Sequence, residues 1–179
     1  QFKSAISELS KEGMEGLVID LRDNPGGLLD VTCEMLDRMI KKGLLVYTVD
    51  KYGKRVDEDA TDSDSFDKPV AILVNGNSAS ASEVFSGAMK DYKAATLVGT
   101  KTFGKGIVQS IVPFGDGTAM KVTVSKYYTP NGVNIHGTGI EPDVVVELSK
   151  DATKNGKYDR KYDNQLTKAL DVVVDKLKK

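Results

Sequence analysis

Ser80, in the segment NGNSASASE, has a setting that suits nucleophilic chemistry. It lies between a predicted buried strand and a predicted helix. A residue at the start of a helix faces free backbone N–H groups and the positive end of the helix dipole, which favour developing negative charge. Such a place suits a serine whose reaction produces an oxyanion. A structural role is the alternative, because Ser80 and Glu83 form the S-x-x-E pattern of a capping box.

Lys105 is the candidate base for this serine. It lies in TKTFGKGIVQ between Gly104 and Gly106, where the backbone can turn tightly and approach other groups closely. A lysine can take the proton of a serine hydroxyl only when it is neutral, and burial favours the neutral form. The alternative is a surface lysine in a turn.

The loop that carries Lys105 also matches a phosphate-binding pattern. Residues 99–105 satisfy G-x-x-x-x-G-K and follow an apolar strand, as a P-loop does. However, Gly106 stands where a serine or threonine should hold magnesium. The following IVQSIV is typical of a strand, so no helix N-terminus is predicted to bind phosphate. A phosphate-binding protein therefore stays as the minor alternative.

Three further features could carry chemistry. In LRDNPGG, Gly26 and Gly27 could each aim a backbone N–H at a reacting carbonyl oxygen, or simply make a turn. His136 is the only histidine, and its position among glycines favours a surface or structural role. Cys33 is the only cysteine and is interpreted as a core residue of a helix. With one residue of each type, an intrachain disulfide and a Cys/His zinc cluster are excluded.

The composition predicts a single domain with an ordinary core. The chain has 179 residues and a net charge of −1, which leaves no electrostatic footprint for nucleic acid or an anionic membrane. No apolar run approaches the roughly 20 residues that span a bilayer.

The elements that must position these residues alternate between short apolar strands and amphipathic helices, which indicates a layered α/β domain. We expect helices over residues 2–12, 30–42, 81–92 and 163–178. We expect strands over 16–20, 44–50, 69–74, 94–99 and within IEPDVVVEL, and a hairpin that turns at 116–117. Segment 50–67 is interpreted as a solvated hairpin and loop, and 151–161 as a charged linker. The inward residues of the last helix should be Leu166, Ala169, Leu170, Val173 and Leu177.

Four segments in this order closely resemble the carboxyl-terminal processing peptidases, or tail-specific proteases. They are LVIDLRDNPGG, VAILVNGNSASASEVFSGAMKDY, LVGTKTFGKGIVQ and KVTVSKYYTPNGVNIHGTGIEPD, and the resemblance covers about residues 2–147. It implies a core of short buried strands and helices similar to the crotonase and Clp-protease spiral. Residues 1–150 would form the catalytic core, with 151–179 as a linker and a C-terminal helix packed on it.

The resemblance also implies roles for individual residues. Ser80 would be the nucleophile, Lys105 the general base and Gln109 the residue that orients the lysine. Gly26 and Ala81 would supply the oxyanion-hole N–H groups, with Gly27 as the alternative to Gly26. If Gln109 lies in a strand, it shares a face with Lys105 and can hydrogen-bond to it. The family uses no cofactor and no metal.

The partners implied are proteins with apolar C-terminal tails, which the family captures with a PDZ domain. No segment here resembles that domain or the N-terminal helical region usually found before the core, so we expect a fragment or a processed form. The resemblance places the protein outside the cytoplasm, in a bacterial periplasm or cell envelope, with any membrane anchor in the missing N-terminal region. Exposed sheet edges could support a homo-oligomer. A non-catalytic peptide-binding or assembly module of the same fold is the main rival interpretation.

Overall fold

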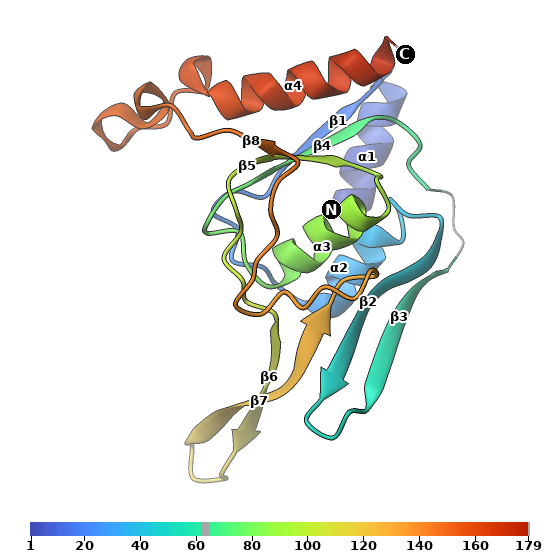
Figure 1. The fold of residues 1–179 in the computed structure, drawn as a ribbon, viewed down its shortest axis with the longest axis vertical. Coiled ribbons are helices and arrows are strands. Elements are labelled where there is room, and N and C mark those ends of the chain that lie inside the picture. Colours follow the sequence, from blue (N-terminus) through green and yellow to red (C-terminus); the bar gives the residue numbers. More distant parts are fainter. Residues whose placement is uncertain (62–64, 179) are drawn as a thin grey trace.

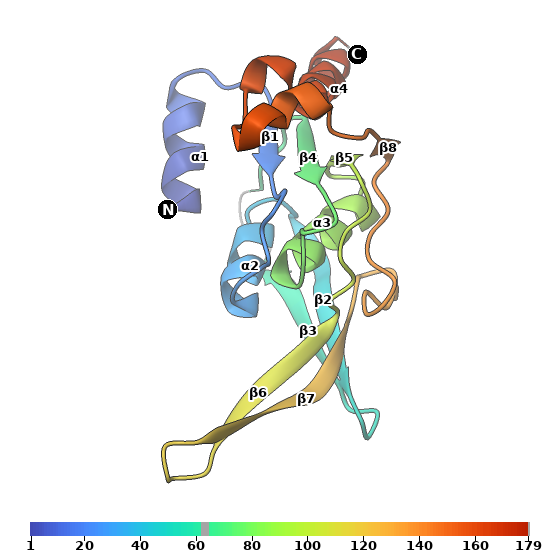
Figure 2. The same cartoon turned by 90° about the vertical axis from the view of Figure 1, so that its left-hand side faces the viewer.

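The computed structural model describes residues 1–61 and 65–178. Figures 1 and 2 show its helices and strands from two sides. In chain order they are α1 (Phe2–Lys11), β1 (Leu17–Asp20), α2 (Leu29–Leu36), β2 (Lys42–Asp50), β3 (Arg55–Thr61), β4 (Val70–Val74), α3 (Ala81–Asp91), β5 (Thr96–Gly99), β6 (Ile107–Pro113), β7 (Ala119–Tyr128), β8 (Val144–Val145), the 3₁₀ helices η1 (Lys150–Gly156) and η2 (Arg160–Tyr162), and α4 (Asn164–Leu177).

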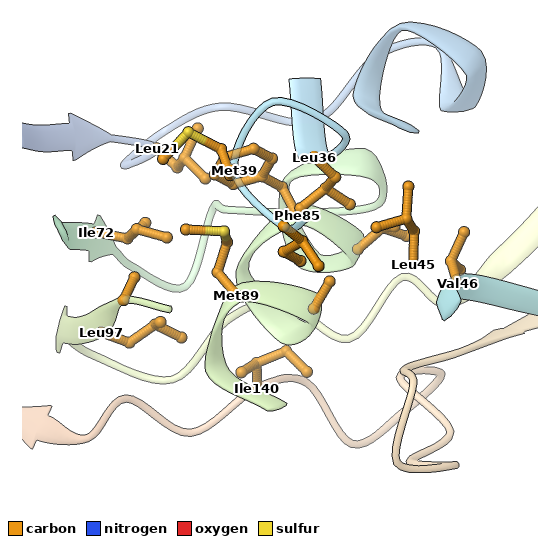
Figure 3. Close-up of a cluster of buried hydrophobic side chains, with 14 of the residues drawn as sticks. Leu21, Leu36, Met39, Leu45, Val46, Ile72, Phe85, Met89, Leu97 and Ile140 are labelled. Atoms are coloured by element: carbon orange, nitrogen blue, oxygen red, sulfur yellow. The ribbon is translucent and has the colours of Figure 1, made fainter. Parts of the chain in front are cut away.

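A parallel sheet with the order β1-β4-β5-β8 forms the centre of the fold. Every residue of β4 is buried, so the strand packs on both faces, as strands in parallel sheets do. On one face Ile72 joins the main core with Phe85 of α3 (Figure 3). On the other face Leu73 packs against Ala169 and Val173 of α4. The sheet is therefore the middle layer between α3 and α4.

A second, antiparallel sheet has the order β3-β2-β7-β6. Its two hairpins, β2–β3 and β6–β7, extend away from the parallel sheet, on the side opposite α4 (Figure 1). Leu45 and Val46 anchor β2 in the main core, while most of β6 and β7 lies near the surface (Figure 3). The start of β6 follows Lys105 directly, so this sheet fixes one side of the candidate site.

Most of the predicted elements are confirmed. The helices over 2–12 and 81–92 and the strands over 16–20, 69–74 and 94–99 appear within a few residues of their expected bounds. The hairpin that turns at 116–117 is also present, closed by a hydrogen bond from Phe114 N to Thr118 O. In segment 50–67 a hairpin forms as expected, although residues 62–64 lie outside the described residues.

Two predicted boundaries were wrong. The helix expected to continue to Lys42 ends at Leu36. Lys42 is already the first residue of β2, where it pairs with Thr61 of β3. Met39 and Ile40 are still buried, because the turn after α2 folds into the same core. Their apolar side chains prolonged the helical pattern without prolonging the helix. The strand expected in IEPDVVVEL is only the two residues of β8.

The C-terminal segment differs more from expectation. The charged linker folds into η1 and η2 instead of running free. In α4, Ala169 and Val173 face the sheet as predicted, but Leu170 and Leu177 are each 44% exposed. A buried polar residue, Gln165, faces inward instead. No helix in the described ranges is long and apolar enough to cross a membrane.

Candidate active site

Ser80 occupies a strained position between β4 and α3. It is the N-cap residue of α3 and has φ 55° and ψ −119°. A positive φ is uncommon for a residue with a side chain and costs on the order of 1–3 kcal/mol, so it persists only where surrounding contacts enforce it. Ala81, the first residue of α3, follows with its N–H at the positive end of the helix. The predicted nucleophile is thus held in the sharp strand-to-helix turn that the sequence suggested.

The contacts that enforce this turn centre on Glu83, whose side chain is fully buried. Its Oε2 accepts the Ser80 N–H at 2.9 Å, which is the carboxylate half of the expected capping box. Its Oε1 accepts the Thr102 hydroxyl at 2.6 Å and the Gly104 N–H at 2.7 Å. A buried carboxylate needs such donors to offset its lost hydration.

Lys105 is joined to Ser80 through the same carboxylate. The Lys105 N–H donates to Glu83 Oε2 at 2.8 Å, and this oxygen also accepts from Ser80. The two predicted catalytic residues are therefore fixed on either side of one atom. Both are partly buried. No hydrogen bond joins the Ser80 hydroxyl to the Lys105 ammonium within the described residues.

The turn at Gly26 lies directly against the nucleophile. Gly26 has φ 96°, and a Cβ there would come within 2.7 Å of Ala81 N and 2.9 Å of Ser80 Cβ. Only glycine allows this approach. The Gly26 N–H donates to Asn24 Oδ1 at 2.9 Å, whereas those of Gly27 and Ala81 have no acceptor among the described residues. The structure thus brings Gly26 next to Ala81, while Gly27 lines the same hollow as both, and of the two glycines Gly27 has the free N–H.

This turn is tied to the nucleophile loop by side-chain and backbone bonds. Asn24 O accepts the Ala79 N–H at 3.1 Å and the Ser82 hydroxyl at 3.1 Å. Asp23 Oδ1 accepts the amide groups of Asn77 and Asn75. These two hydrogen bonds lower the pKa of Asp23 below its ordinary value, and the bond from Asn77 has the larger effect. The two halves of the site, 60 or so residues apart in sequence, form one rigid unit.

Gln109 does not contact Lys105 as expected. It is partly buried in β6, but the register of β6 with β7 shifts between Val108 and Gln109. The extra residue of this bulge is Val124 on β7, so the bulge leaves the alternation of side chains along β6 intact. Lys105 precedes β6, which begins at Ile107, so strand alternation does not extend to it. The expected hydrogen bond between Lys105 and Gln109 is absent from the part of the chain that the structure describes.

An apolar hollow of about 170 Å³ opens beside the Gly26–Gly27 turn. Its walls come from that turn, from α2 and from the start of α3. The lining residues are Leu21, Asn24, Gly26, Gly27, Leu28, Val31, Thr32, Met35, Ala81, Ser82 and Phe85. Ala81, which follows Ser80, lines the hollow. Figure 2 shows α2 and α3 together below the strand ends of β1 and β4.

The alternative catalytic residues are not supported. His136 is exposed, and its backbone N–H, not its ring, donates to Asn134 Oδ1. Burial and the nearby Glu58 and Asp30 raise the pKa of Cys33 to about 11, so this thiol is not a nucleophile at neutral pH. Residues 99–105 are followed by strand β6, and the Glu83 carboxylate occupies the N–H groups that would face a phosphate. The P-loop interpretation is therefore wrong.

The sequence pattern marked Glu83 only as a helix cap. Its larger role depends on Thr102 and Gly104, about 20 residues further along the chain, and no local pattern signals that contact. Arg22, close to the glycine turn, was also not singled out. Its side chain donates four hydrogen bonds, to Asp20 and Gln165. A charged residue between a buried strand and a glycine turn was the only available signal.

Comparison with known proteins identifies the family of this chain. Residues 1–146 match the model of peptidase family S41. A protein of Staphylococcus epidermidis named Probable CtpA-like serine protease is 46% identical over 99% of this chain and 37% of its own length. One of Staphylococcus aureus with the same name is 47% identical over 84% of this chain and 31% of its own length. The chain thus spans about a third of these relatives.

Solved structures of related proteases share the fold of this chain. The photosystem II D1 C-terminal processing protease is 42% identical, with a TM-score of 0.74 over 80% of this chain and 38% of that one. Mature CPAF, at 18% identity, shares the fold with a TM-score of 0.80 over 98% of this chain and 47% of its own. These matches confirm the layered α/β fold, which is of the Clp-like spiral type. Together with the family match and the identity to the staphylococcal relatives, they establish that the chain belongs to peptidase family S41, within its carboxyl-terminal processing group.

Proposed function

We propose that this chain is the catalytic core of a serine endopeptidase that cleaves protein substrates near their C-termini, with Ser80 as nucleophile and Lys105 as general base. The single observation that carries this proposal is the Glu83 carboxylate, which holds the backbones of Ser80 and Lys105 through one oxygen atom. Catalysis by a pair of side chains requires such mutual fixation, since small displacements cost large factors in rate.

In the proposed reaction, the Ser80 hydroxyl attacks the substrate carbonyl carbon while neutral Lys105 takes its proton. The tetrahedral oxyanion collapses, the C–N bond breaks, and Lys105 returns the proton to the departing amine. Water then attacks the acyl ester and gives a proton to Lys105. As the ester C–O bond breaks, Lys105 returns that proton to Ser80 Oγ, and the carboxylic acid product leaves. The side chains need to meet only with substrate bound, because catalytic hydrogen bonds in a free enzyme often tighten at that stage.

The oxyanion would be held by the Ala81 N–H and by the Gly26–Gly27 turn. Gly26 is the donor that the family resemblance implies, and its N–H would have to leave Asn24 Oδ1, whereas the Gly27 N–H is already free. Donors aimed at developing charge usually supply the largest single part of such a rate enhancement. In this scheme Gln109 orients Lys105 once the substrate is bound.

The hollow beside the turn would receive the substrate side chain just before the cleaved bond. Its apolar walls favour an aliphatic residue at that position and disfavour a carboxylate, which would lose its hydration there. This agrees with protein substrates that have apolar tails. We place the complete protein outside the cytoplasm, in a bacterial cell envelope, where a segment ahead of this core would capture the tail.

The test uses the complete protein and an unstructured peptide with an aliphatic residue at the cleavage position. Ser80→Ala and Lys105→Arg should each lower kcat/KM by about 1,000-fold or more, because arginine keeps the charge of lysine but cannot act as a base. Lys101→Arg is the matched control. Lys101 is exposed in the same loop and pairs with Glu141, so cleavage should continue at the wild-type rate.

Two results would count against this function. Undiminished cleavage by Ser80→Ala would remove the nucleophile assignment. Tight binding of the peptide by wild type without any cleavage would favour the peptide-binding module instead. The same peptide with aspartate at the cleavage position should be cleaved much more slowly if the hollow selects that side chain.

A further inference from the structure

Arg22 lies between β1 and the glycine turn, and its guanidinium points away from the active site toward the C-terminal segment. Its Nη2 forms an ion pair with Asp163 at 2.8 Å, and its Nη1 donates to Gln165 Oε1 at 3.0 Å. Its Nε and Nη2 also reach Asp20. The Arg22 side chain is 9% exposed and that of Asp163 is fully buried. All three nitrogens of the guanidinium are therefore engaged.

The two C-terminal partners are themselves fixed. Asp163 caps α4 by accepting the Leu166 N–H at 2.8 Å, and it accepts the Tyr158 hydroxyl at 2.7 Å. Gln165, which is 1% exposed, donates to Val146 O at 2.6 Å. Partners held this firmly can impose a position on Arg22 rather than follow it.

The charges of this cluster suit a buried pair. Burial alone would lower the pKa of Arg22, but its hydrogen bonds to Asp20 and Asp163 outweigh that effect and raise it. Burial alone would raise the pKa of Asp163, but the hydrogen bond from Arg22 outweighs it and lowers the pKa. Removing one partner of such a pair leaves the other uncompensated, which is more costly than losing an exposed ion pair.

The glycine turn is attached on two sides. Asp23, directly after Arg22, has φ 57°, so the turn starts in a conformation that side chains rarely adopt. On the side of the nucleophile loop, Leu21 O accepts the Ser78 hydroxyl at 2.7 Å and Asp23 N donates to Asn75 Oδ1 at 3.0 Å. On the other side, the guanidinium of Arg22 attaches the start of the turn to the C-terminal segment.

We propose that Arg22, Asp163 and Gln165 form a C-terminal clamp that positions the oxyanion turn, residues 23–27. The clamp makes the segment 158–165, which lies beyond the matched family region of residues 1–146, part of the catalytic apparatus. Asp163 and Gln165 touch no substrate and act through Arg22, so they are positioning residues. The catalytic part of this inference rests on the proposed peptidase function.

The first experiment measures the turn itself and does not depend on activity. In Asp163→Asn, amide hydrogen exchange of residues 23–26 should become at least about tenfold faster, while residues 70–74 of β4 keep their protection. Asparagine still caps a helix, so α4 should start as before. Asp159→Asn is the matched control, since Asp159 caps η2 by accepting from Lys161 N and does not contact Arg22.

The second experiment measures catalysis well below the unfolding temperature. Asp163→Asn should lower kcat about tenfold or more and leave KM nearly unchanged, because the turn contributes only when the oxyanion forms. A substrate-like peptide aldehyde, which forms an oxyanion adduct, should bind correspondingly more weakly, and the matching peptide alcohol should bind as before. Combining Asp163→Asn with Arg22→Ala should be no worse than Arg22→Ala alone, since both remove one interaction.

The outcomes separate this proposal from the proposed function. Wild-type exchange rates and wild-type kcat in Asp163→Asn would overturn the clamp while leaving the peptidase assignment intact. If Ser80→Ala shows that the protein is not a peptidase, the exchange experiment still decides whether the clamp holds the turn. Should Asp163→Asn fail to fold, Gln165→Met removes the contact with Arg22 Nη1 at similar size, and the same two measurements apply to it.

Discussion

At the smallest scale, a single carboxylate organises the proposed catalytic residues. Glu83 accepts hydrogen bonds from Ser80, Thr102, Gly104 and Lys105, and it is fully buried. It thereby enforces the strained backbone of Ser80 and the path of the lysine loop at once. The capping pattern and the catalytic interpretation, which the sequence presented as alternatives, describe one arrangement.

Replacing this carboxylate tests its importance. In Glu83→Gln, one of the two oxygens becomes an amide group that opposes the surrounding N–H donors. We expect the free energy of unfolding to fall by about 2–4 kcal/mol, because buried donors lose a charged acceptor. We also expect kcat to fall at temperatures where the variant is folded. Urea unfolding and steady-state kinetics measure the two effects.

The exposed residue Glu8 on α1 provides the matched control. Glu8→Gln should leave both the stability and kcat unchanged. A folded Glu83→Gln protein with full activity and full stability would show that the carboxylate is not required for the geometry of Ser80 and Lys105.

Local sequence singled out Ser80, Lys105 and the Gly26–Gly27 turn as candidates, each with a structural alternative. The family resemblance then selected the catalytic interpretation. The expected contact between Lys105 and Gln109 assumed that both lie in one strand, whereas β6 begins at Ile107, after Lys105. The Glu83 contacts depend on tertiary folding, so they too were out of reach.

At the scale of elements, the ends of β4 and β5 deliver the two halves of the catalytic pair. Val74 ends β4 shortly before Ser80, and Gly99 ends β5 shortly before Lys105. Val74 and Gly99 are paired in the sheet, and Thr100 N donates to Val74 O at 3.1 Å. Gly99 has φ 130°, and a Cβ there would collide with the Val74 carbonyl oxygen. The glycine that resembled the start of a P-loop is therefore needed to let the strands approach.

Gly99→Ala should consequently separate the strand ends and destabilise the protein. We expect a loss of about 3 kcal/mol in the free energy of unfolding, from backbone strain and overpacking together. Gly76→Ala is the matched control in the β4–α3 connection, because its added methyl group meets only Lys101 O, at 3.9 Å. It should change stability by no more than about 0.5 kcal/mol. Equal stability of the two variants in urea would contradict the role given to Gly99.

Element prediction succeeded where the apolar pattern was bounded by a clear break. The fully apolar β4 and the helix α3 fall under this description. It failed at α2, where Met39 and Ile40 are buried by a turn that continues the helical spacing. It also failed on α4, where the inward side includes the polar residue Gln165, which hydrophobicity alone cannot place.

For the whole molecule, two carboxyl groups with lowered pKa values link stability to pH. Asp163 and Asp23 both have pKa values below the ordinary range, with Arg22 among the causes for each. A carboxyl group with a lower pKa in the folded state stabilises the fold at pH values above its unfolded pKa. That contribution is lost as the pH falls through the folded value.

We therefore expect the free energy of unfolding to be insensitive to these two groups between neutral pH and about pH 5, and to fall below about pH 4. The groups facing Asp163 are Arg22 and Tyr158, neither of which titrates in that range. Asp163→Asn should flatten the acid part of the curve, measured by urea unfolding at a series of pH values. An unchanged slope would mean that Asp163 is not paired in solution.

The layered fold as a whole was predictable, because alternating strands and helices limit the arrangements and the resemblance selects one of them. The contribution of the C-terminal segment was not. Its sequence is charged and suggested a linker, yet 3₁₀ turns and Asp163 attach it to the start of the glycine turn.

That attachment has a consequence for the order in which the protein matures. The hydrogen bond between Arg22 and Gln165 joins residues 143 positions apart. During synthesis from the N-terminus, the nucleophile, the lysine loop and the glycine turn all leave the ribosome well before residue 165 does. The proposed clamp cannot close until then, so a nascent chain carries Ser80 and Lys105 for some time before the turn at residues 23–27 gains its second attachment. If the clamp acts as proposed, the site is therefore complete only after the last helix has begun to form.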